Sequence, residues 1–440
     1  MSRASTLAAR TPASRDRYVD FLRAFSIGVV VLGHWLMAVV TVSPNGFKAG
    51  NALAVMPWLQ PLTWVLQVMP VFFFVGGFAH LVTYDANKRR GGRYVHFVHG
   101  RLARLLRPVG VLLAVWVPLT LALEASSLSS SVVRPVTKLV VQLLWFLGVY
   151  VVVVALAPVT IAAHRRWGWR VPAVFVASAC LVDVAAFGFG LSGLRWVNVL
   201  PVWLLAHQLG YFYRSLGRRS GLALSVGGFA ALVGLTAWGP YPTSMVGMPG
   251  ERVSNMAPPT VCIVALTCWL VGLVVLARPF VTRWLERPRV WTAVVALNGV
   301  IMTVFLWHLT ALLLAVFVLL PRGWFPTPAA GTAAWWATRP LWFAVLLVVL
   351  GGLVAVFGRL ERPAPVAYAP APFRTPVRVQ ALAVAGVVLV AVGVLGLAMA
   401  GLSEMATRSS SLLVVTVTPL GSLLNVAAGA LLLRRTVRTP

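Results

Sequence analysis

The chain has 440 residues, of which 60% are hydrophobic and only 10% are charged, and its mean hydropathy is +0.88. Soluble globular domains are about 45–50% apolar and about 25% charged, so this composition excludes an ordinary soluble domain. The net charge of +28 is not evidence for nucleic-acid binding until the positions of the charges are known.

Apolar stretches of about twenty residues recur along the chain, and each can cross the ~30 Å hydrocarbon core of a bilayer. We therefore predict an all-α polytopic membrane protein. Hydropathy predicts twelve spans, at residues 18–42, 58–84, 108–129, 138–163, 172–192, 196–213, 220–239, 259–277, 293–320, 339–358, 379–402 and 411–433. The sixth of these is the shortest.

The basic residues predict how these spans are oriented. With a cytoplasmic N-terminus, 28 of the 37 Lys and Arg residues fall in cytoplasmic segments and only eight in outer loops, as the positive-inside rule requires. We therefore predict that both termini are cytoplasmic and that most of the positive charge reflects topology. The first apolar run is too long for a signal peptide, so we expect it to be a retained spanning helix.

The first predicted span contains two residues that are costly in a bilayer, Arg23 and His34. Ionisable residues inside spans usually face a bundle interior or a cavity and are functional candidates. Eleven residues of ideal helix place the two side chains within about 20° of one face and ~16 Å apart along the axis. Asp20 precedes Arg23 by three residues and is close enough to pair with it. The alternative is that Arg23 reaches the cytoplasmic surface and His34 is a satisfied core histidine.

A second candidate region combines the stretch MPVFFFVGGFAH, residues 69–80, with a following cytoplasmic loop that ends in HFVHGRLARLLRP. Three arginines recur there at every third position: Arg101, Arg104 and Arg107. On a helix they cover a ~120° arc, which suits a multiply phosphorylated ligand because guanidinium groups bind phosphate in a fork geometry. The alternative is an ordinary positive-inside loop. His96 and His99 have no accompanying carboxylate or thiol, so we expect no metal site there.

Later spans add polar and aromatic side chains, namely Gln142, Trp145, Asp183, Trp307 and His308. Counting along each span places His34, Trp145 and His308 in the outer half of the membrane. These three residues are therefore candidates for one pocket, and Arg23 would mark the cytoplasmic mouth of the same channel.

These residues resemble the signatures of the acyltransferase-3 family of integral membrane acyltransferases. The first span resembles the family pattern of Leu-Asp-x-Leu-Arg, ten residues and His, with matches at Asp20, Leu22, Arg23 and His34. FFFVGGF resembles the family's Phe-Phe-x-x-Ser-Gly-Phe element, with matches at Phe73, Phe74, Gly77 and Phe78. Gly76 departs from it, because many members have Ser there, which puts any role for that hydroxyl in doubt.

Three further elements follow in the family's order: RLARLLRP, then LWFL at residues 144–147, then FLWH at residues 305–308. The resemblance covers residues 17–308, and ten spans is the family's usual core. The resemblance and the predicted spans together give a cytoplasmic tail at 1–17 and a ten-helix acyltransferase domain at 18–358. The resemblance does not cover the rest, for which hydropathy and composition predict a Pro-rich cytoplasmic linker at 359–378, two additional transmembrane helices at 379–433 and a cytoplasmic tail at 434–440.

The resemblance implies transfer of an acyl group, commonly acetyl, from acyl-CoA to a hydroxyl of a glycan, glycolipid or secondary metabolite. His34 would be the general base, since its near-neutral pKa suits that role, and His308 is the second candidate base. Arg23, steadied by Asp20, would hold the donor or orient the site. The donor would contact Arg101, Arg104, Arg107, Phe73, Phe74, Gly77 and Trp145. Acyl-CoA would be the only cofactor, without a metal, and the partners would be membrane lipid and a hydroxyl-bearing acceptor. The preference for Arg over Lys indicates a GC-rich bacterial genome, so we expect a bacterial plasma-membrane protein.

Two other classes of protein fit part of the pattern. A proton-coupled transporter also combines twelve spans with ionisable residues at the midplane, but we find no paired Gly/Pro-broken helices in corresponding halves. A membrane glycosyltransferase that uses a lipid-linked sugar usually needs acidic residues in an early outer loop, and residues 43–57 contain none.

Overall fold

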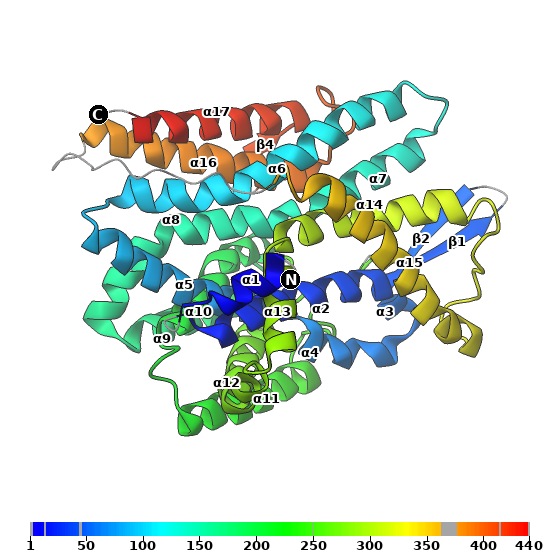
Figure 1. The fold of residues 1–440 in the computed structure, drawn as a ribbon. Helices are drawn as coiled ribbons and strands as arrows, with labels where there is room; N and C mark the ends of the chain where they lie inside the picture. The colour runs from blue at the N-terminus through cyan, green and yellow to red at the C-terminus, as the bar shows by residue number, and fades with distance from the viewer. Residues whose placement is uncertain are drawn as a thin grey trace. The chain divides into compact units, whose positions relative to one another are not determined.

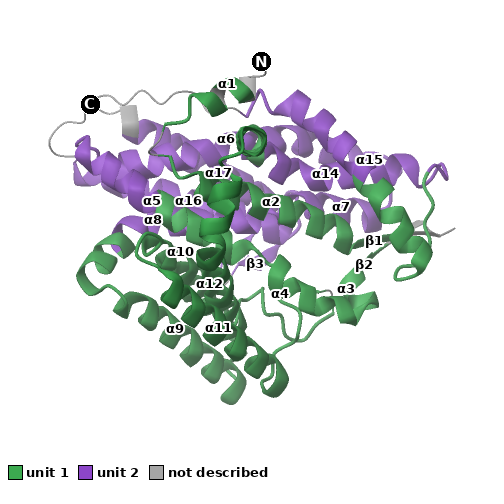
Figure 2. Ribbon diagram, turned by 60° about the horizontal axis from the view of Figure 1, so that its bottom comes forward, with its two compact units in different colours: residues 1–79, 160–301, 325–343 green, residues 80–159, 302–324, 344–440 purple. Residues whose placement is uncertain are grey.

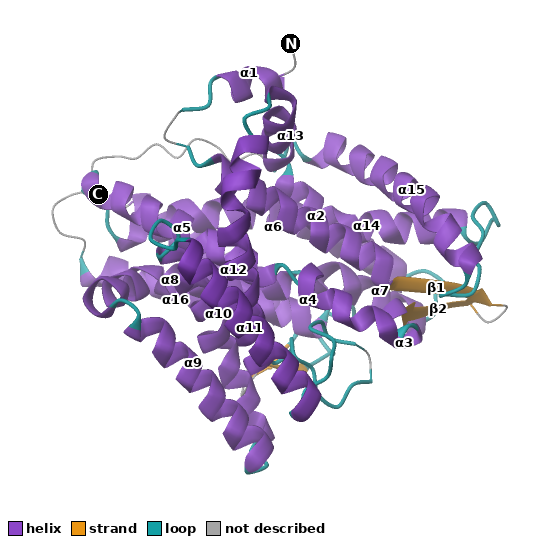
Figure 3. Cartoon of the chain, turned by 90° about the horizontal axis from the view of Figure 1, so that it is seen from below, coloured by secondary structure: helices purple, strands orange, loops and turns teal. Residues whose placement is uncertain are grey.

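The computed structural model describes residues 3–12, 15–43, 46–248, 250–361, 376–412 and 415–438, which are mostly helical (Figures 1 and 3). The first half contains α1 (Arg3–Ala9), α2 (Arg17–Met37), β1 (Ala38–Ser43), β2 (Gly46–Asn51), α3 (Ala52–Val55), η1 (Pro57–Leu62), α4 (Thr63–Leu66), α5 (Met69–Arg89), α6 (Tyr94–Glu124), α7 (Ser130–Gln142), α8 (Leu144–Trp167), α9 (Arg170–Asp183), η2 (Val184–Gly188), η3 (Ser192–Asn198) and α10 (Val199–Tyr211). The second half contains α11 (Arg218–Trp238), α12 (Val261–Trp284), α13 (Pro288–Asn298), α14 (Ile301–Leu319), α15 (Ala333–Phe357), α16 (Val377–Ala400), β3 (Ser410–Leu412), β4 (Val415–Val417) and α17 (Pro419–Arg438).

In the described part of the chain, ten helical segments are long and apolar enough to cross a membrane. The chain is therefore a polytopic helical membrane protein. Two of the twelve predicted spans are not among the ten. One is α10, which has only 13 residues and a length of about 20 Å, and the other is α17. The count of twelve stays a prediction.

Two short antiparallel hairpins replace helix that we predicted, so the all-α expectation needs correction. The first span ends at Met37 rather than at residue 42, and β1 pairs with β2 from Ala38 to Asn51. Val39, Val40, Thr41 and Val42 follow one another there, and β-branched residues favour strand over helix. The second hairpin, β3–β4, occupies the start of the predicted twelfth span, so α17 begins only at Pro419.

The helix α6 starts earlier than predicted, at Tyr94 rather than at residue 108. Its first turn is capped where the Arg93 N–H donates to His96 Nδ1 at 3.3 Å. A helix of 31 residues is about 46 Å long and exceeds the ~30 Å hydrocarbon core. The three arginines predicted in a loop therefore lie on this helix.

The chain divides into two compact units, which Figure 2 colours separately. Unit 1 comprises residues 1–79, 160–301 and 325–343, and unit 2 comprises residues 80–159, 302–324 and 344–440. Each unit is described by itself.

In unit 1, glycines bring the backbones of α11 and α12 into contact. A Cβ on Gly228 would lie 2.4 Å from the backbone nitrogen of Trp269, and one on Gly272 would lie 2.4 Å from that of Ser225. Without a bulky side chain at these positions, two helices can approach closely enough for extensive van der Waals packing, which is a main source of stability between helices in membranes.

In unit 2, a glycine likewise allows the backbones of α16 and α17 to approach closely. A Cβ on Gly393 would lie 2.6 Å from the carbonyl oxygen of Ser422. The Leu395 side chain of α16 in turn fills the space that a Cβ on Gly148 of α8 would need. Arg134 of α7 donates to the Glu404 carboxylate after α16 through Nε at 3.0 Å. The helix α16 and the residues directly after it are thus packed onto α7 and α8 of their own unit.

The predicted topology can be tested with two single cysteines. In a background lacking Cys180, Cys262 and Cys268, Thr6→Cys and Arg252→Cys place thiols at exposed positions. We expect a membrane-impermeant maleimide to label Arg252→Cys in intact cells and Thr6→Cys only after the membrane is opened. Labelling of both thiols from the same side would contradict the predicted orientation.

Candidate active site

The start of α2 is anchored through Asp16. Its carboxylate caps the helix by accepting from the backbone N–H groups of Tyr18 and Val19, both at 3.1 Å, an arrangement that satisfies donors left open in the first turn. Its other oxygen accepts from the Tyr213 hydroxyl at 2.9 Å and lies 4.0 Å from Arg278. Asp16 therefore ties the start of α2 to α12 and to the segment after α10.

Asp20 lies near two arginines rather than one. Arg23 is within ion-pair distance of it at 4.0 Å, as the sequence predicts. Arg15 is closer, because its Nε donates to the Asp20 carboxylate at 2.5 Å. Asn298 of α13 donates to the Asp20 carbonyl oxygen at 2.9 Å and thereby holds α13 against α2.

Arg23 is the less engaged of the two arginines. Its side chain is 33% exposed, and the 4.0 Å approach to Asp20 is the only polar interaction that it makes with the residues the structure describes. A guanidinium offers five donors, so Arg23 retains the capacity to bind an anion.

His34 lies in the last turn of α2, eleven residues beyond Arg23 on the same uninterrupted helix. It is half-buried, and its carbonyl accepts from the Ala38 N–H where the helix ends. Helix geometry therefore keeps both side chains on one face, about 16 Å apart along the axis.

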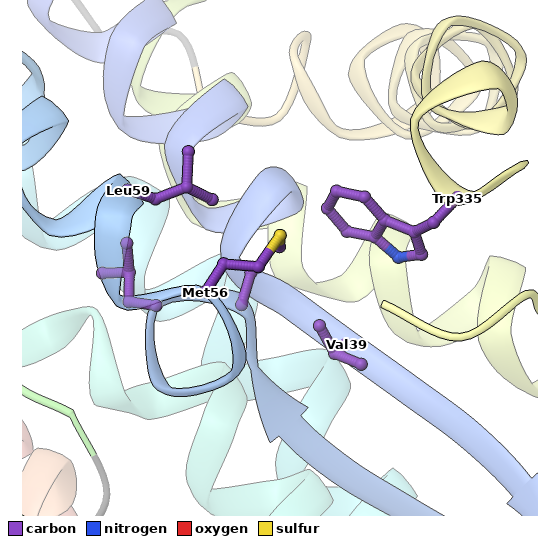
Figure 4. Packing of buried hydrophobic residues seen from close by; sticks show 6 residues of the cluster. Val39, Met56, Leu59 and Trp335 are labelled. Atoms are coloured by element: carbon purple, nitrogen blue, oxygen red, sulfur yellow. The ribbon is translucent and has the colours of Figure 1, made fainter. Parts of the chain in front are cut away.

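An apolar cluster covers this end of α2. Its buried members are Val39, Ala52, Leu53, Met56, Leu59 and Trp335, and Leu36 and Met37 of α2 pack against it. In Figure 4 the Met56 sulfur points toward the Trp335 indole, and both side chains belong to this buried cluster. Two residues within one turn of His34 thus pack against a buried apolar cluster.

The residues matching the family's second element are packed between helices of unit 1. A Cβ on Gly77 would lie 1.9 Å from the carbonyl oxygen of His207, and one on Gly210 would lie 2.0 Å from that of Phe74. Phe73 is fully buried and stacks on Trp203 with ring centroids 4.8 Å apart. This close crossing of α5 and α10 accounts for the residue types at these positions, and donor binding by Phe73, Phe74 and Gly77 stays a prediction.

In unit 2, the three arginines of α6 have different surroundings. Arg101 is half-buried and donates to the Thr83 hydroxyl. Arg107 is exposed and donates through Nε to the Leu360 carbonyl at 2.8 Å. Arg104 is exposed, with no hydrogen bond or ion pair to the residues that the structure describes.

His308 is fully buried on α14 of unit 2. Its Nδ1 lies 2.6 Å from the Phe305 carbonyl oxygen. Because a carbonyl can only accept, Nδ1 carries the proton, and Nε2 is the basic nitrogen of the neutral ring. The bond therefore selects a tautomer that suits a general base.

Beside His308, a buried carboxylate joins α14 to the end of α15. Glu361 is 4% exposed and accepts from Trp307 Nε1 at 2.8 Å and from the Thr303 hydroxyl at 2.5 Å. The Trp307 indole also stacks on Phe357 at 3.8 Å. Burial raises the pKa of the Glu361 carboxyl, although both hydrogen bonds oppose this shift.

Aromatic rings connect the elements that carry Trp145 and His308 within unit 2. Trp145 is half-buried and contacts Phe146, whose ring lies edge-on to Phe305 at 5.7 Å. Gln142 is exposed at the end of α7. The structure therefore brings α8 and α14 together, while His34 belongs to unit 1, so the predicted common pocket stays a prediction.

Asp183 has a structural role in unit 1. It is buried and accepts from Asn198 at 2.7 Å, from the Tyr241 hydroxyl at 3.0 Å and from the backbone N–H of Val261 at 2.9 Å. The last bond helps to cap α12. These partners explain how a carboxylate is accommodated at the end of α9.

Sequence reasoning missed Arg15, Glu361 and a pair in unit 2, in which the hydroxyl of half-buried Tyr150 lies 3.1 Å from Nε2 of the buried His80. Glu361 carried a usable signal, because a chain with only nine acidic residues places one directly after a spanning helix. Arg15 carried none, since a basic residue before the first span is what topology alone requires.

Spanning helices that carry buried ionisable residues define a multi-pass membrane protein. The family model described as an acyltransferase domain, Acyl_transf_3, matches residues 16–358. The chain therefore belongs to the acyltransferase-3 family and is a membrane acyltransferase. Neither a curated protein nor a solved structure gives a significant match.

Proposed function

We propose that the protein is a bacterial plasma-membrane O-acyltransferase. It moves an acetyl group from cytosolic acetyl-CoA to a hydroxyl of a glycan, glycolipid or secondary metabolite. Family membership supports the reaction class, and the donor and acceptor are our inference.

The arrangement of α2 carries this proposal. One helix holds a partly exposed, incompletely bonded guanidinium near its start and an imidazole in its last turn. The separation of about 16 Å suits a donor whose charged end stays at the cytoplasmic surface while its long, uncharged pantetheine arm enters the protein.

In the proposed reaction, His34 takes the proton from the acceptor hydroxyl as its oxygen attacks the thioester carbonyl carbon. The tetrahedral intermediate collapses with cleavage of the C–S bond, and the departing thiolate takes a proton back from the imidazolium. The products are an O-acyl ester and free coenzyme A, and His34 is regenerated.

The direct test is an assay of the reaction. Membranes with and without the protein are incubated with labelled acetyl-CoA, and lipid and glycan fractions are examined by mass spectrometry. We expect a new species heavier by one acetyl group only where the protein is present. If no fraction gains an acetyl group although the protein is intact and folded, the proposed donor or acceptor class is wrong.

A separate prediction concerns the arginines of α6. Replacing Arg101, Arg104 and Arg107 together with Gln should raise the KM for acetyl-CoA by at least about tenfold, since charge-assisted hydrogen bonds to phosphate are each worth about 1.5–3 kcal/mol. The KM for the acceptor should change little. Arg90→Gln, which removes an exposed positive charge from the same unit, is the charge control. An unchanged donor KM in the triple variant would mean that these arginines only set topology.

A further inference from the structure

The start of α2 holds more positive charge than its carboxylates neutralise. Asp16 is occupied by the α2 backbone, Tyr213 and Arg278. Asp20 is left with two arginines, and the nearer one comes from outside the helix, because Arg15 Nε lies 2.5 Å from one oxygen and Arg23 lies 4.0 Å from the other.

The described residues on either side of Arg15 pack against α13 and the end of α12. α1 packs against α13, and Trp291 of α13 donates to the Thr11 hydroxyl at 3.0 Å. Arg17 lies over the Trp291 ring at 5.1 Å and donates to the Leu285 carbonyl at 3.3 Å. These contacts hold the chain on both sides of Arg15 against the α12–α13 region.

We propose that Arg15 is a positioning residue that neutralises Asp20 and thereby leaves Arg23 available for an anionic group of the donor. The Asp20 carboxylate carries one negative charge and cannot neutralise the two guanidinium groups beside it. With Arg15 on Asp20, the surplus charge resides on Arg23, which keeps unused donors. Without Arg15, Asp20 would draw Arg23 closer than its present 4.0 Å, into direct hydrogen bonds, and would compete with the ligand.

This inference rests on the proposed acyl-CoA donor and deepens it. A second substitution should compensate for the loss of Arg15, which would not happen if the first one simply damaged the structure. Removing Arg15 is harmful only while Asp20 carries a charge, so removing the charge of Asp20 as well should restore ligand binding.

The test measures binding of free coenzyme A to the purified full-length protein by isothermal titration calorimetry, together with the KM and kcat for acetyl-CoA. We expect Arg15→Gln to weaken coenzyme A binding by about fivefold to tenfold, as loss of roughly 1–1.4 kcal/mol would, with little change in kcat. Arg15→Lys should retain most of the wild-type affinity for coenzyme A because it keeps the positive charge. Arg10→Gln, which removes an exposed positive charge from the same segment, is the matched control and should bind as the wild type does.

The decisive variant is Arg15→Gln/Asp20→Asn, which should bind coenzyme A more tightly than Arg15→Gln alone. A double variant no better than the single one, or an Arg15→Gln protein with wild-type affinity, would overturn the inference. If Arg23→Gln loses affinity in that same experiment, the proposed donor stands although the inference has failed. If the wild type binds no coenzyme A, the proposed donor fails, and the inference fails with it.

Discussion

Replacement of His34 by alanine should abolish acyl transfer while the protein still inserts into the membrane and still binds acyl-CoA. The imidazole lies in the last turn of α2, on the face that also carries Arg23, and a group in hydrogen-bond reach of the acceptor must take its proton. General base catalysis contributes about 10²- to 10⁴-fold, so kcat should fall by that amount. His34→Gln retains polarity but supplies no base, so it should be equally inactive. Turnover of labelled acetyl-CoA and coenzyme A binding are measured on the same preparations.

His308 is the alternative base, and parallel substitutions separate the two assignments. The bond from Nδ1 to the Phe305 carbonyl leaves Nε2 as the basic nitrogen, so His308 also has a suitable tautomer. We expect His308→Ala to keep measurable turnover if it orients substrate and His34 is the base. Substantial turnover in His34→Ala beside an inactive His308→Ala would reverse the assignment.

Gly77→Ala should prevent stable folding, although it adds a single methyl group. The new Cβ would lie 1.9 Å from the carbonyl oxygen of His207, so the backbones of α5 and α10 would have to separate. Overpacking a well-packed site costs about 1–3 kcal/mol and sometimes more, and a clash with backbone belongs at the upper end. We expect a large fall in Tm and in the yield of monodisperse protein, measured by thermal unfolding in detergent and size-exclusion chromatography.

The control for this variant is Gly227→Ala on α11 of the same unit. A Cβ at Gly227 would meet no atom within 4 Å, and alanine is favoured over glycine inside a helix by about 1 kcal/mol. Its Tm should be unchanged or slightly higher. A Gly77→Ala protein as stable as this control would contradict the close crossing and leave donor binding as the explanation for the glycine.

The spans themselves could be predicted because each is a local property of the chain. Apolar stretches of sufficient length predict membrane helices whatever surrounds them, and ten such helices are present in the described residues. The boundaries were less predictable. At residues 38–43, 410–412 and 415–417, hydropathy alone does not distinguish a helix from a hairpin, and pairing with a second strand decided the outcome.

In the candidate site, too, some features follow from the local sequence and others depend on tertiary contacts. The common face of Arg23 and His34 follows from helix periodicity, and α2 confirms that one unbroken helix carries both. The predicted approach of Arg23 to Asp20 is present, but the closest partner of Asp20 could not be predicted in this way. The i,i+3 spacing pointed to Arg23, whereas the closest cation is Arg15, which precedes the helix.

The sequence by itself thus determined that this is a polytopic helical membrane protein, which residues are costly to place in a bilayer, and which family its motifs resemble. Only the tertiary structure decided what those residues touch: that Gly77 serves a helix crossing, that Asp183 caps α12 and that Glu361 holds Trp307. The physical reason is the distance along the sequence over which each interaction acts. Hydropathy and helical periodicity are set by neighbours along the chain, whereas hydrogen bonds and close packing join residues that are tens to hundreds of positions apart.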